Sequence, residues 1–197
     1  MPASGRTAYD TPRQGVTQGI TMTDTAYLGQ TVDVILGQEF LTWLWYRSES
    51  RNGSFETEDG RNFGVFMEQR IAVQGGEGES LETATVSGSM SQLREARLGL
   101  STGKKVSRAL IRIERDADSW LLTLKAEDFA LNSLKTPVIE KDGEDDDPDA
   151  RFLEKMYLID TCLGFLDEVY RQFLAVRLSP RWNDEVRDLR VWMERTA

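Results

Sequence analysis

The feature that most constrains this chain is an apolar run near its C-terminal end that repeats with a heptad period. Successive members lie four and three residues apart through three repeats, at Phe152, Met156, Ile159, Leu163, Leu166, Tyr170 and Phe173. This spacing places them along one stripe of an α-helix. Asp147 provides an N-cap and Pro148 a first helical residue, so we predict a helix over residues 148–179. Neighbouring apolar residues broaden the stripe, which favours packing across a sheet over a free coiled coil.

The preceding sequence alternates between apolar and polar residues, as β-strands do. In residues 105–115, Ala109, Ile111 and Ile113 share one face, and the alternation resumes over residues 120–124 after a turn. These two runs predict an antiparallel hairpin. Further strands are expected over residues 63–73, 81–86 and 129–134, with a short helix over residues 91–100.

A tryptophan-rich helix is predicted over residues 32–48, and it is apolar nearly all round. Such helices are buried between layers or lie in an oligomer interface, and core burial is the more ordinary interpretation. We therefore expect an α+β fold, in which this helix and the long C-terminal helix pack on an antiparallel sheet. The expected divisions are a mobile segment at 1–27, the α+β domain at 28–179 and an amphipathic helix at 180–197. For a homodimer interface, we single out Phe40, Trp43, Trp45, Phe152, Met156, Ile159, Tyr170 and Phe173.

Composition excludes several classes of chemistry. The 197 residues contain no histidine, which removes Ser–His–Asp and Cys–His catalysis and His-ligated zinc. The single cysteine, Cys162, can form neither an internal disulfide nor a thiolate metal site, and we expect it in the core. No catalytic residue, metal ligand or cofactor is predicted. No apolar stretch approaches the roughly 20 residues of a membrane span, so a cytoplasmic protein without a membrane partner is expected.

Charge is distributed unevenly along the chain. The total of 24 basic and 33 acidic residues gives a net charge of −9. Residues 140–149 carry a local charge of −6, whereas residues 91–115 carry seven basic and two acidic residues, or +5. On a strand, Lys104, Arg108 and Arg112 would share one face, and cations in such a row can follow a phosphate backbone. An ordinary solvated sheet face explains the same pattern. The candidate DNA contacts are Arg94, Arg97, Lys104, Lys105, Arg108 and Arg112.

The order of several segments resembles the C-terminal half of the RdgC-type recombination-associated proteins of bacteria. The segment Leu36-Gly-Gln-Glu-Phe-Leu-Thr-Trp-Leu-Trp-Tyr-Arg-Ser-Glu49 is similar to one of the family. The later matches, in the family's order, are Thr85-Val-Ser-Gly88, Leu93-Arg-Glu-Ala96, Gly103-Lys-Lys-Val106, Trp120-Leu-Leu-Thr-Leu124 and Asp145-Asp-Asp-Pro-Asp-Ala-Arg-Phe152. The similarity extends over roughly residues 36–173, and the family's N-terminal half has no counterpart here.

The resemblance implies a non-enzymatic, nucleoid-associated α+β protein that binds duplex DNA with little sequence preference and modulates recombination. Full-length members of the family form a ring-shaped homodimer around DNA and restrain recombinase filaments. The basic positions that best match the family are Lys104, Lys105 and Arg108. Because the N-terminal half is absent, ring closure does not carry over to this chain.

Two other functions remain open at this point. One is a protein-interaction module that assembles with a separately encoded partner and does not bind DNA directly. The other is a carboxylate and metal enzyme, although no calcium-loop, phosphate-loop or nuclease motif supports it.

Overall fold

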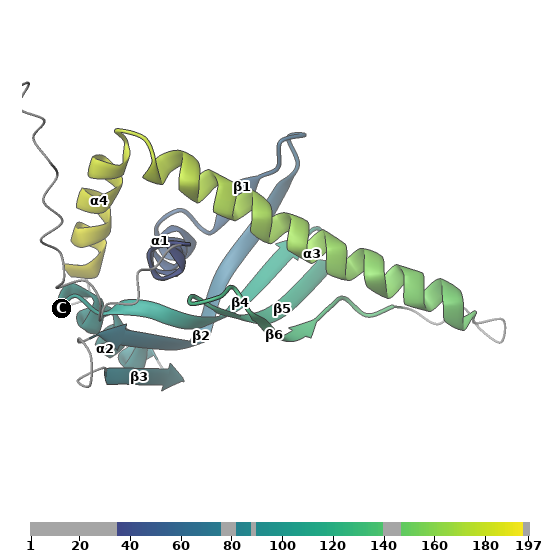
Figure 1. Ribbon diagram of the computed structural model, residues 1–197, viewed down its shortest axis with the longest axis horizontal. Coiled ribbons are helices and arrows are strands. Elements are labelled where there is room, and N and C mark those ends of the chain that lie inside the picture. The colour runs from purple at the N-terminus through teal and green to yellow at the C-terminus, as the bar shows by residue number, and fades with distance from the viewer. Residues whose placement is uncertain (1–34, 76–81, 88–89, 140–146, 195–197) are drawn as a thin grey trace, which may run out of the picture. The chain divides into compact units, whose positions relative to one another are not determined.

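The computed structural model describes residues 35–75, 82–87, 90–139 and 147–194. The described residues form four helices and six strands (Figure 1). The helices are α1 (Gly37–Ser50), α2 (Met90–Ser101), α3 (Pro148–Arg177) and α4 (Trp182–Glu194). The strands are β1 (Ser54–Glu56), β2 (Asn62–Gly75), β3 (Glu82–Ser87), β4 (Lys105–Arg115), β5 (Asp118–Lys125) and β6 (Leu131–Lys135).

The strands form one antiparallel sheet in the order β1-β2-β4-β5-β6, and β3 pairs with the C-terminal half of β2. The predicted hairpin is confirmed, because β4 and β5 pair throughout from Arg108 opposite Lys125 to Arg115 opposite Asp118. The expected α+β class with an antiparallel sheet is therefore confirmed. Sequence analysis did not predict β1, which lies between the expected helix over residues 32–48 and the expected strand over residues 63–73.

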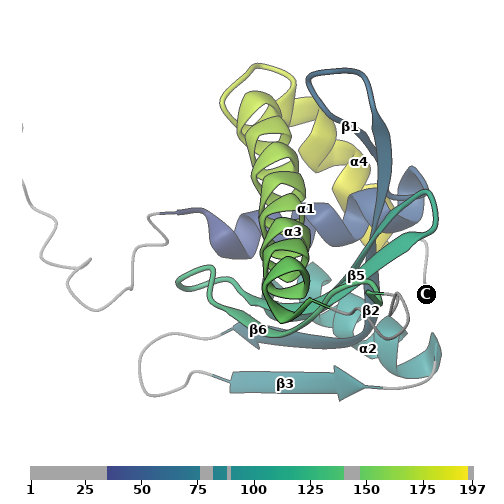
Figure 2. The ribbon, with the colours of Figure 1, turned by 90° about the vertical axis from the view of Figure 1, so that its right-hand side faces the viewer.

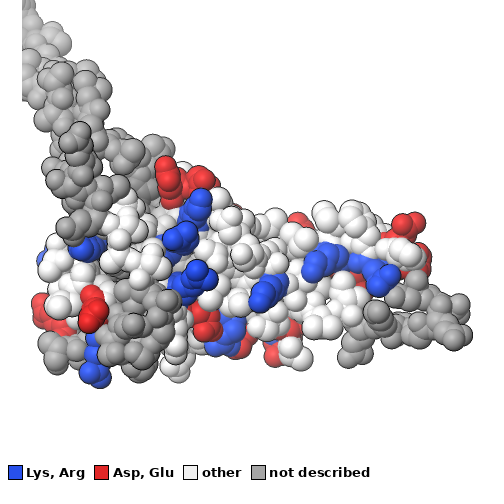
Figure 3. Space-filling model, turned by 90° about the horizontal axis from the view of Figure 1, so that it is seen from below, with Lys and Arg blue, Asp and Glu red and all other residues white. Residues whose placement is uncertain are grey.

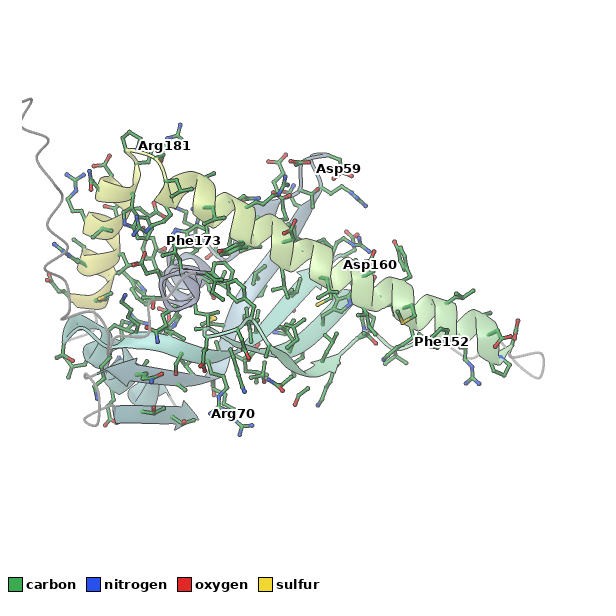
Figure 4. All side chains as sticks on the ribbon, in the orientation of Figure 1. Asp59, Arg70, Phe152, Asp160, Phe173 and Arg181 are labelled. Carbon is green, nitrogen blue, oxygen red and sulfur yellow. The ribbon has the colours of Figure 1, made fainter. Side chains whose placement is uncertain are left out.

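Helix α1 lies on one face of the sheet, with α3 and α4 on that same side (Figures 1 and 2). The Phe173 ring of α3 lies 5.5 Å from each of the rings of Phe40 and Trp43 on α1. Figure 4 shows Phe173 pointing from α3 into this layer. Phe40, Trp43, Trp45 and Phe173 are all at most 1% exposed. Assigning these four to an oligomer interface is therefore wrong for the folded chain, because the chain's own core encloses them.

Helix α3 begins where the cap predicts, since the Asp147 carboxylate accepts a hydrogen bond from the Asp149 backbone N–H at 3.0 Å. It packs on the sheet as expected. The ring of Phe165 stacks on Phe63 at 4.6 Å, and the Trp120 indole N–H donates to the Leu158 carbonyl at 2.9 Å.

The core-facing stripe of α3 differs from the predicted heptad stripe. Its buried residues are Leu158, Cys162, Phe165, Val169 and Phe173. A strict seven-residue repeat drifts by about 20° per heptad around a straight helix, or about 60° over three heptads. The heptad stripe therefore faces the core at Phe173 but has turned towards solvent at Phe152, which is 64% exposed. Between these ends, Ile159 and Tyr170 are partly buried.

Helix α4 belongs to the same compact unit as the sheet. Its Trp192 ring lies 5.5 Å from that of Trp45, and its buried Glu185 carboxylate accepts from the Trp43 indole at 2.9 Å. The chain divides into the units Met1–Gln30 and Thr31–Ala197, so the helix that we predicted as a separate C-terminal division is part of the α+β domain. The predicted mobile segment at 1–27 lies outside the described residues.

Candidate nucleic-acid interface

No helix of the described residues covers the sheet face opposite α1 and α3, which we call the open face and which carries polar side chains. On β4, exposed Arg108 and half-buried Arg112 alternate with fully buried Ala109, Ile111 and Ile113. Figure 4 shows Arg70 of β2 extending from this face, away from the helices. Viewed from below in Figure 3, Lys and Arg atoms follow one another along this side, with Asp and Glu atoms mainly towards its edges.

A hollow of about 230 Å³ lies on this open face across five strands. Three cationic side chains line it, namely Arg70, Arg108 and Lys125, which we call the open-face cations. The hydroxyl and amide side chains in its wall are Thr85, Thr123, Asn132 and Ser133. The hollow therefore offers hydrogen-bond donors and positive charge, and no carboxylate of the described residues lines it.

The open-face cations are close together because of strand pairing. Arg108 lies directly opposite Lys125 on β5, and Ala72, two residues after Arg70, lies opposite Arg108 on β2. Directly opposed side chains have Cβ atoms about 5 Å apart, and like charges in such a pair destabilise a sheet. All three residues are exposed, and no carboxylate among the described residues forms an ion pair with them. The face thus retains a concentration of positive charge that folding alone does not favour.

Arg112, also on this face, is neutralised within the protein. Its guanidinium pairs with Glu68 at 2.5 Å and with Glu114, and it lies 4.9 Å from the centre of the Phe66 ring. A phosphate would have to compete with two carboxylates, so this predicted contact is weaker than its position on the strand suggests.

Arg97 and Lys105 of the predicted set also have internal partners. The Arg97 guanidinium pairs with Glu49 and lies 4.5 Å from the centre of the Trp192 ring, where it connects α2 to α1 and α4. The Lys105 amine lies 3.8 Å from the Glu39 carboxylate of α1.

Lys104 does not share a face with Arg108, which corrects the predicted stripe. One step on β2, from Ala72 to Val73, corresponds to two on β4, from Arg108 to Val106, so Ser107 is an extra residue in a β-bulge. The bulge shifts the alternation of side chains by one residue. Lys104 instead packs beside Gly75 at the end of β2.

Arg94 is exposed on α2 and does not line the hollow. Of the six predicted contacts, only Arg108 lies there. The predicted acidic loop at 140–149 falls largely outside the described residues.

Sequence reasoning missed Arg70 and Lys125. For Lys125 a signal was present, because the two-residue turn at Asp116 and Ala117 sets the hairpin register and places residue 125 opposite residue 108. For Arg70 the signal was partial, because alternation with the core residues Ile71 and Val73 places Arg70 on the opposite face but does not reveal its neighbours on β4. Between Met67 and Ile71, four steps on β2 match only two on β4, an irregularity that alternation does not reveal.

Metal binding, cysteine reactivity and membrane insertion find little support in the described part of the chain. There, no group of three or more His, Cys, Asp or Glu side chains could hold a metal ion. Burial raises the pKa of the Cys162 thiol to about 11, so the thiolate that a reactive cysteine needs is disfavoured. None of the helices in the described ranges has both the length and the apolarity to cross a bilayer.

Comparison with known proteins adds no relative to this picture. No protein-family model, no curated protein and no solved structure matches the chain. The resemblance to the RdgC-type family therefore rests on the quoted segments alone.

Proposed function

We propose that this protein binds the sugar-phosphate backbone of duplex DNA on the open face of its sheet, with little preference for sequence. The observation that carries the proposal is the set of open-face cations, Arg70, Arg108 and Lys125, which lie together without a carboxylate partner among the described residues. Since like charges in adjacent strands oppose folding, an anionic ligand would relieve the repulsion.

The chemistry of the hollow suits phosphate. Two of the three cations are arginines, whose planar guanidinium can donate two parallel hydrogen bonds to phosphate oxygens. Thr85, Thr123 and Asn132 line the same hollow and can donate further hydrogen bonds. Backbone contacts of this kind position a protein on DNA without reading the bases.

The hollow supports duplex binding better than single-strand binding. Proteins that bind single strands stack the bases on aromatic rings, and the described residues contribute no aromatic side chain to the lining of this hollow. Among the residues that the structure describes, the lining also has no carboxylate that could act as a general base or metal ligand, which supports a binding role over catalysis. The proposal also includes modulation of recombination, recombinase filaments as partners and association with the nucleoid. These three parts rest on the family resemblance alone.

Fluorescence anisotropy with labelled DNA tests the proposal. The full chain should bind two duplexes of unrelated sequence with similar affinity and bind single strands more weakly. The triple variant Arg70→Ala, Arg108→Ala, Lys125→Ala should lose at least tenfold in affinity for both duplexes, since each lost phosphate contact weakens binding.

A charge-matched control distinguishes the site from the overall field of the protein. Arg181, Arg187 and Arg190 are exposed and lie at or on α4. Replacing these three with alanine also takes the net charge from −9 to −12 but should leave affinity within about twofold of the unmodified chain. Equal losses in the two triple variants, or no binding by the unmodified chain, would refute the proposal.

A further inference from the structure

The N-terminal half of α3 presents apolar side chains to solvent. Phe152, Leu153, Met156, Tyr157 and Leu163 are 64%, 67%, 48%, 61% and 42% exposed. Figure 1 shows this part of the helix extending past the strands, and Figure 4 places Phe152 near its end. These five residues, which we call the α3 patch, lie on adjacent rows of one helix face, since residues three and four apart are neighbours there.

The patch matches in size the largest apolar patch of a typical monomer, which is often a binding site. If a fully exposed side chain of this size presents about 150–200 Å², the five together expose about 500 Å². The largest apolar patch on a typical monomer is about 300–600 Å² and is often a binding site. A symmetric pair of such patches would bury about 1,000 Å², which is the size that a specific interface needs.

The arrangement of the patch indicates what covers it. Phe152, Met156 and Leu163 belong to the heptad stripe, and heptad stripes pack against helices that carry the same repeat. A second copy of α3 supplies that repeat in a self-complementary form, as a two-fold interface requires. Because the C-terminal half of α3 packs on the chain's own core, only the N-terminal halves can meet. An antiparallel arrangement allows this while keeping the two sheets at opposite ends.

We propose that two copies of the chain associate through antiparallel pairing of their α3 patches. This inference does not depend on DNA binding, and the same patch would be used whether or not the open face holds a ligand. It retains Phe152 and Met156 of the predicted interface, omits the residues that the core buries, and adds Leu153, Tyr157 and Leu163.

Sedimentation of the full chain tests the association. The unmodified chain should sediment at micromolar concentration with a mass of 2 × 22.4 = 44.8 kDa. The variant Met156→Glu, Leu163→Glu should sediment at 22.4 kDa, because it places charge in the centre of the patch. Both side chains are already partly in solvent, so the fold should tolerate the change.

The matched control is Leu98→Glu. Leu98 is also a helical leucine and is 63% exposed, but it lies on α2, so this variant should remain a dimer. A monomeric unmodified chain would overturn the proposal, as would a dimer that survives the double substitution. An unchanged circular dichroism spectrum of the double variant would show that the loss of association does not result from a loss of folding.

Cysteine cross-linking tests the antiparallel arrangement. The patch is centred near Tyr157, so Tyr157→Cys should lie beside its symmetry mate and form an intermolecular disulfide under mild oxidation. Phe152→Cys should not, because five residues of 1.5 Å rise on each copy separate the two positions by about 15 Å along the helix axis, beyond the reach of a disulfide. Cys162 is buried and should not interfere. Cross-linking of Phe152→Cys in preference to Tyr157→Cys would contradict the antiparallel arrangement.

Discussion

Reversing the charge of Lys125 should stabilise the fold while weakening DNA binding. Lys125 lies directly opposite Arg108 in the β4–β5 ladder, and neither side chain has an ion-pair partner among the described residues. The substitution Lys125→Glu turns a repulsive cross-strand pair into an attractive one. Because Lys125 repels Arg108, a lysine at this position does not serve the stability of the fold.

The size of the effect follows from the geometry of the pair. Directly opposed charged residues contribute about 0.2–1 kcal/mol, with the sign set by their charges, so reversal should raise the free energy of unfolding by about 0.4–2 kcal/mol. For a domain of this size, each kcal/mol shifts Tm by about 2–4 °C, which gives an expected rise of about 1–8 °C. The rise should shrink at high salt, because both side chains are exposed and their interaction is screened.

Lys135→Glu is the matched control. Lys135 is an exposed lysine on β6 that lies opposite the uncharged Leu121, so its reversal should change stability by less than about 0.5 kcal/mol. Thermal unfolding and urea midpoints of both variants, each with and without Arg108→Ala, give the coupling energy of the pair. If Lys125→Glu is no more stable than Lys135→Glu, or if Arg108→Ala does not abolish the gain, the inferred repulsion between these cations is incorrect.

Three further predictions concern the scaffold. Gly37→Ala should lower Tm by at least about 6 °C, because a Cβ there would lie 1.9 Å from the Ala126 carbonyl oxygen. In Gly164→Ala the added Cβ meets nothing within 4 Å, so this substitution should stabilise α3 by about 0.5–1 kcal/mol. Calorimetry that gives both variants a stability change of the same sign would contradict this packing. Glu49→Ala should cost about 2–3 kcal/mol in urea unfolding, since the indole N–H groups of Trp45 and Trp192 lose their acceptor and the ion pair between Arg97 and Glu49 is removed. A loss below about 0.5 kcal/mol would contradict that role. Stability should fall as pH rises from about 9 towards 11, because burial raises the pKa of Cys162 from 9.0 to about 11 and the unfolded thiol ionises first; a thiol reagent that modifies the folded protein rapidly at pH 8 would contradict this.

Much of the fold could be predicted because local signals and tertiary packing agree. The α3 start was readable from Asp147 and Pro148, since a cap depends on residues adjacent in sequence. The β4–β5 hairpin was readable because its turn and alternation lie within one stretch of chain. The face that α3 buries was not, because the heptad stripe and the buried stripe cross at Phe173, and only the position of the sheet decides which of them is covered.

The candidate site was less predictable, because it depends on register between distant strands. The run of basic residues along the sequence suggested one continuous stripe, but the bulge at Ser107 separates Lys104 from Arg108. Partners supplied by other elements then determine which cations remain available. Glu68 of β2 pairs with Arg112, and Glu49 of α1 pairs with Arg97, and neither pairing is local in sequence.

The central claim is that Arg70, Arg108 and Lys125 bind DNA phosphates together, and the salt dependence of binding tests it most directly. Three phosphate contacts predict a slope of about −2.7 for log K against log salt concentration, or about a 40-fold loss of affinity between 50 and 200 mM. The slope should move to about −1.8 in Arg108→Ala and close to zero in the triple alanine variant. A slope that is unchanged in the triple variant would show that DNA binds elsewhere and would contradict the account.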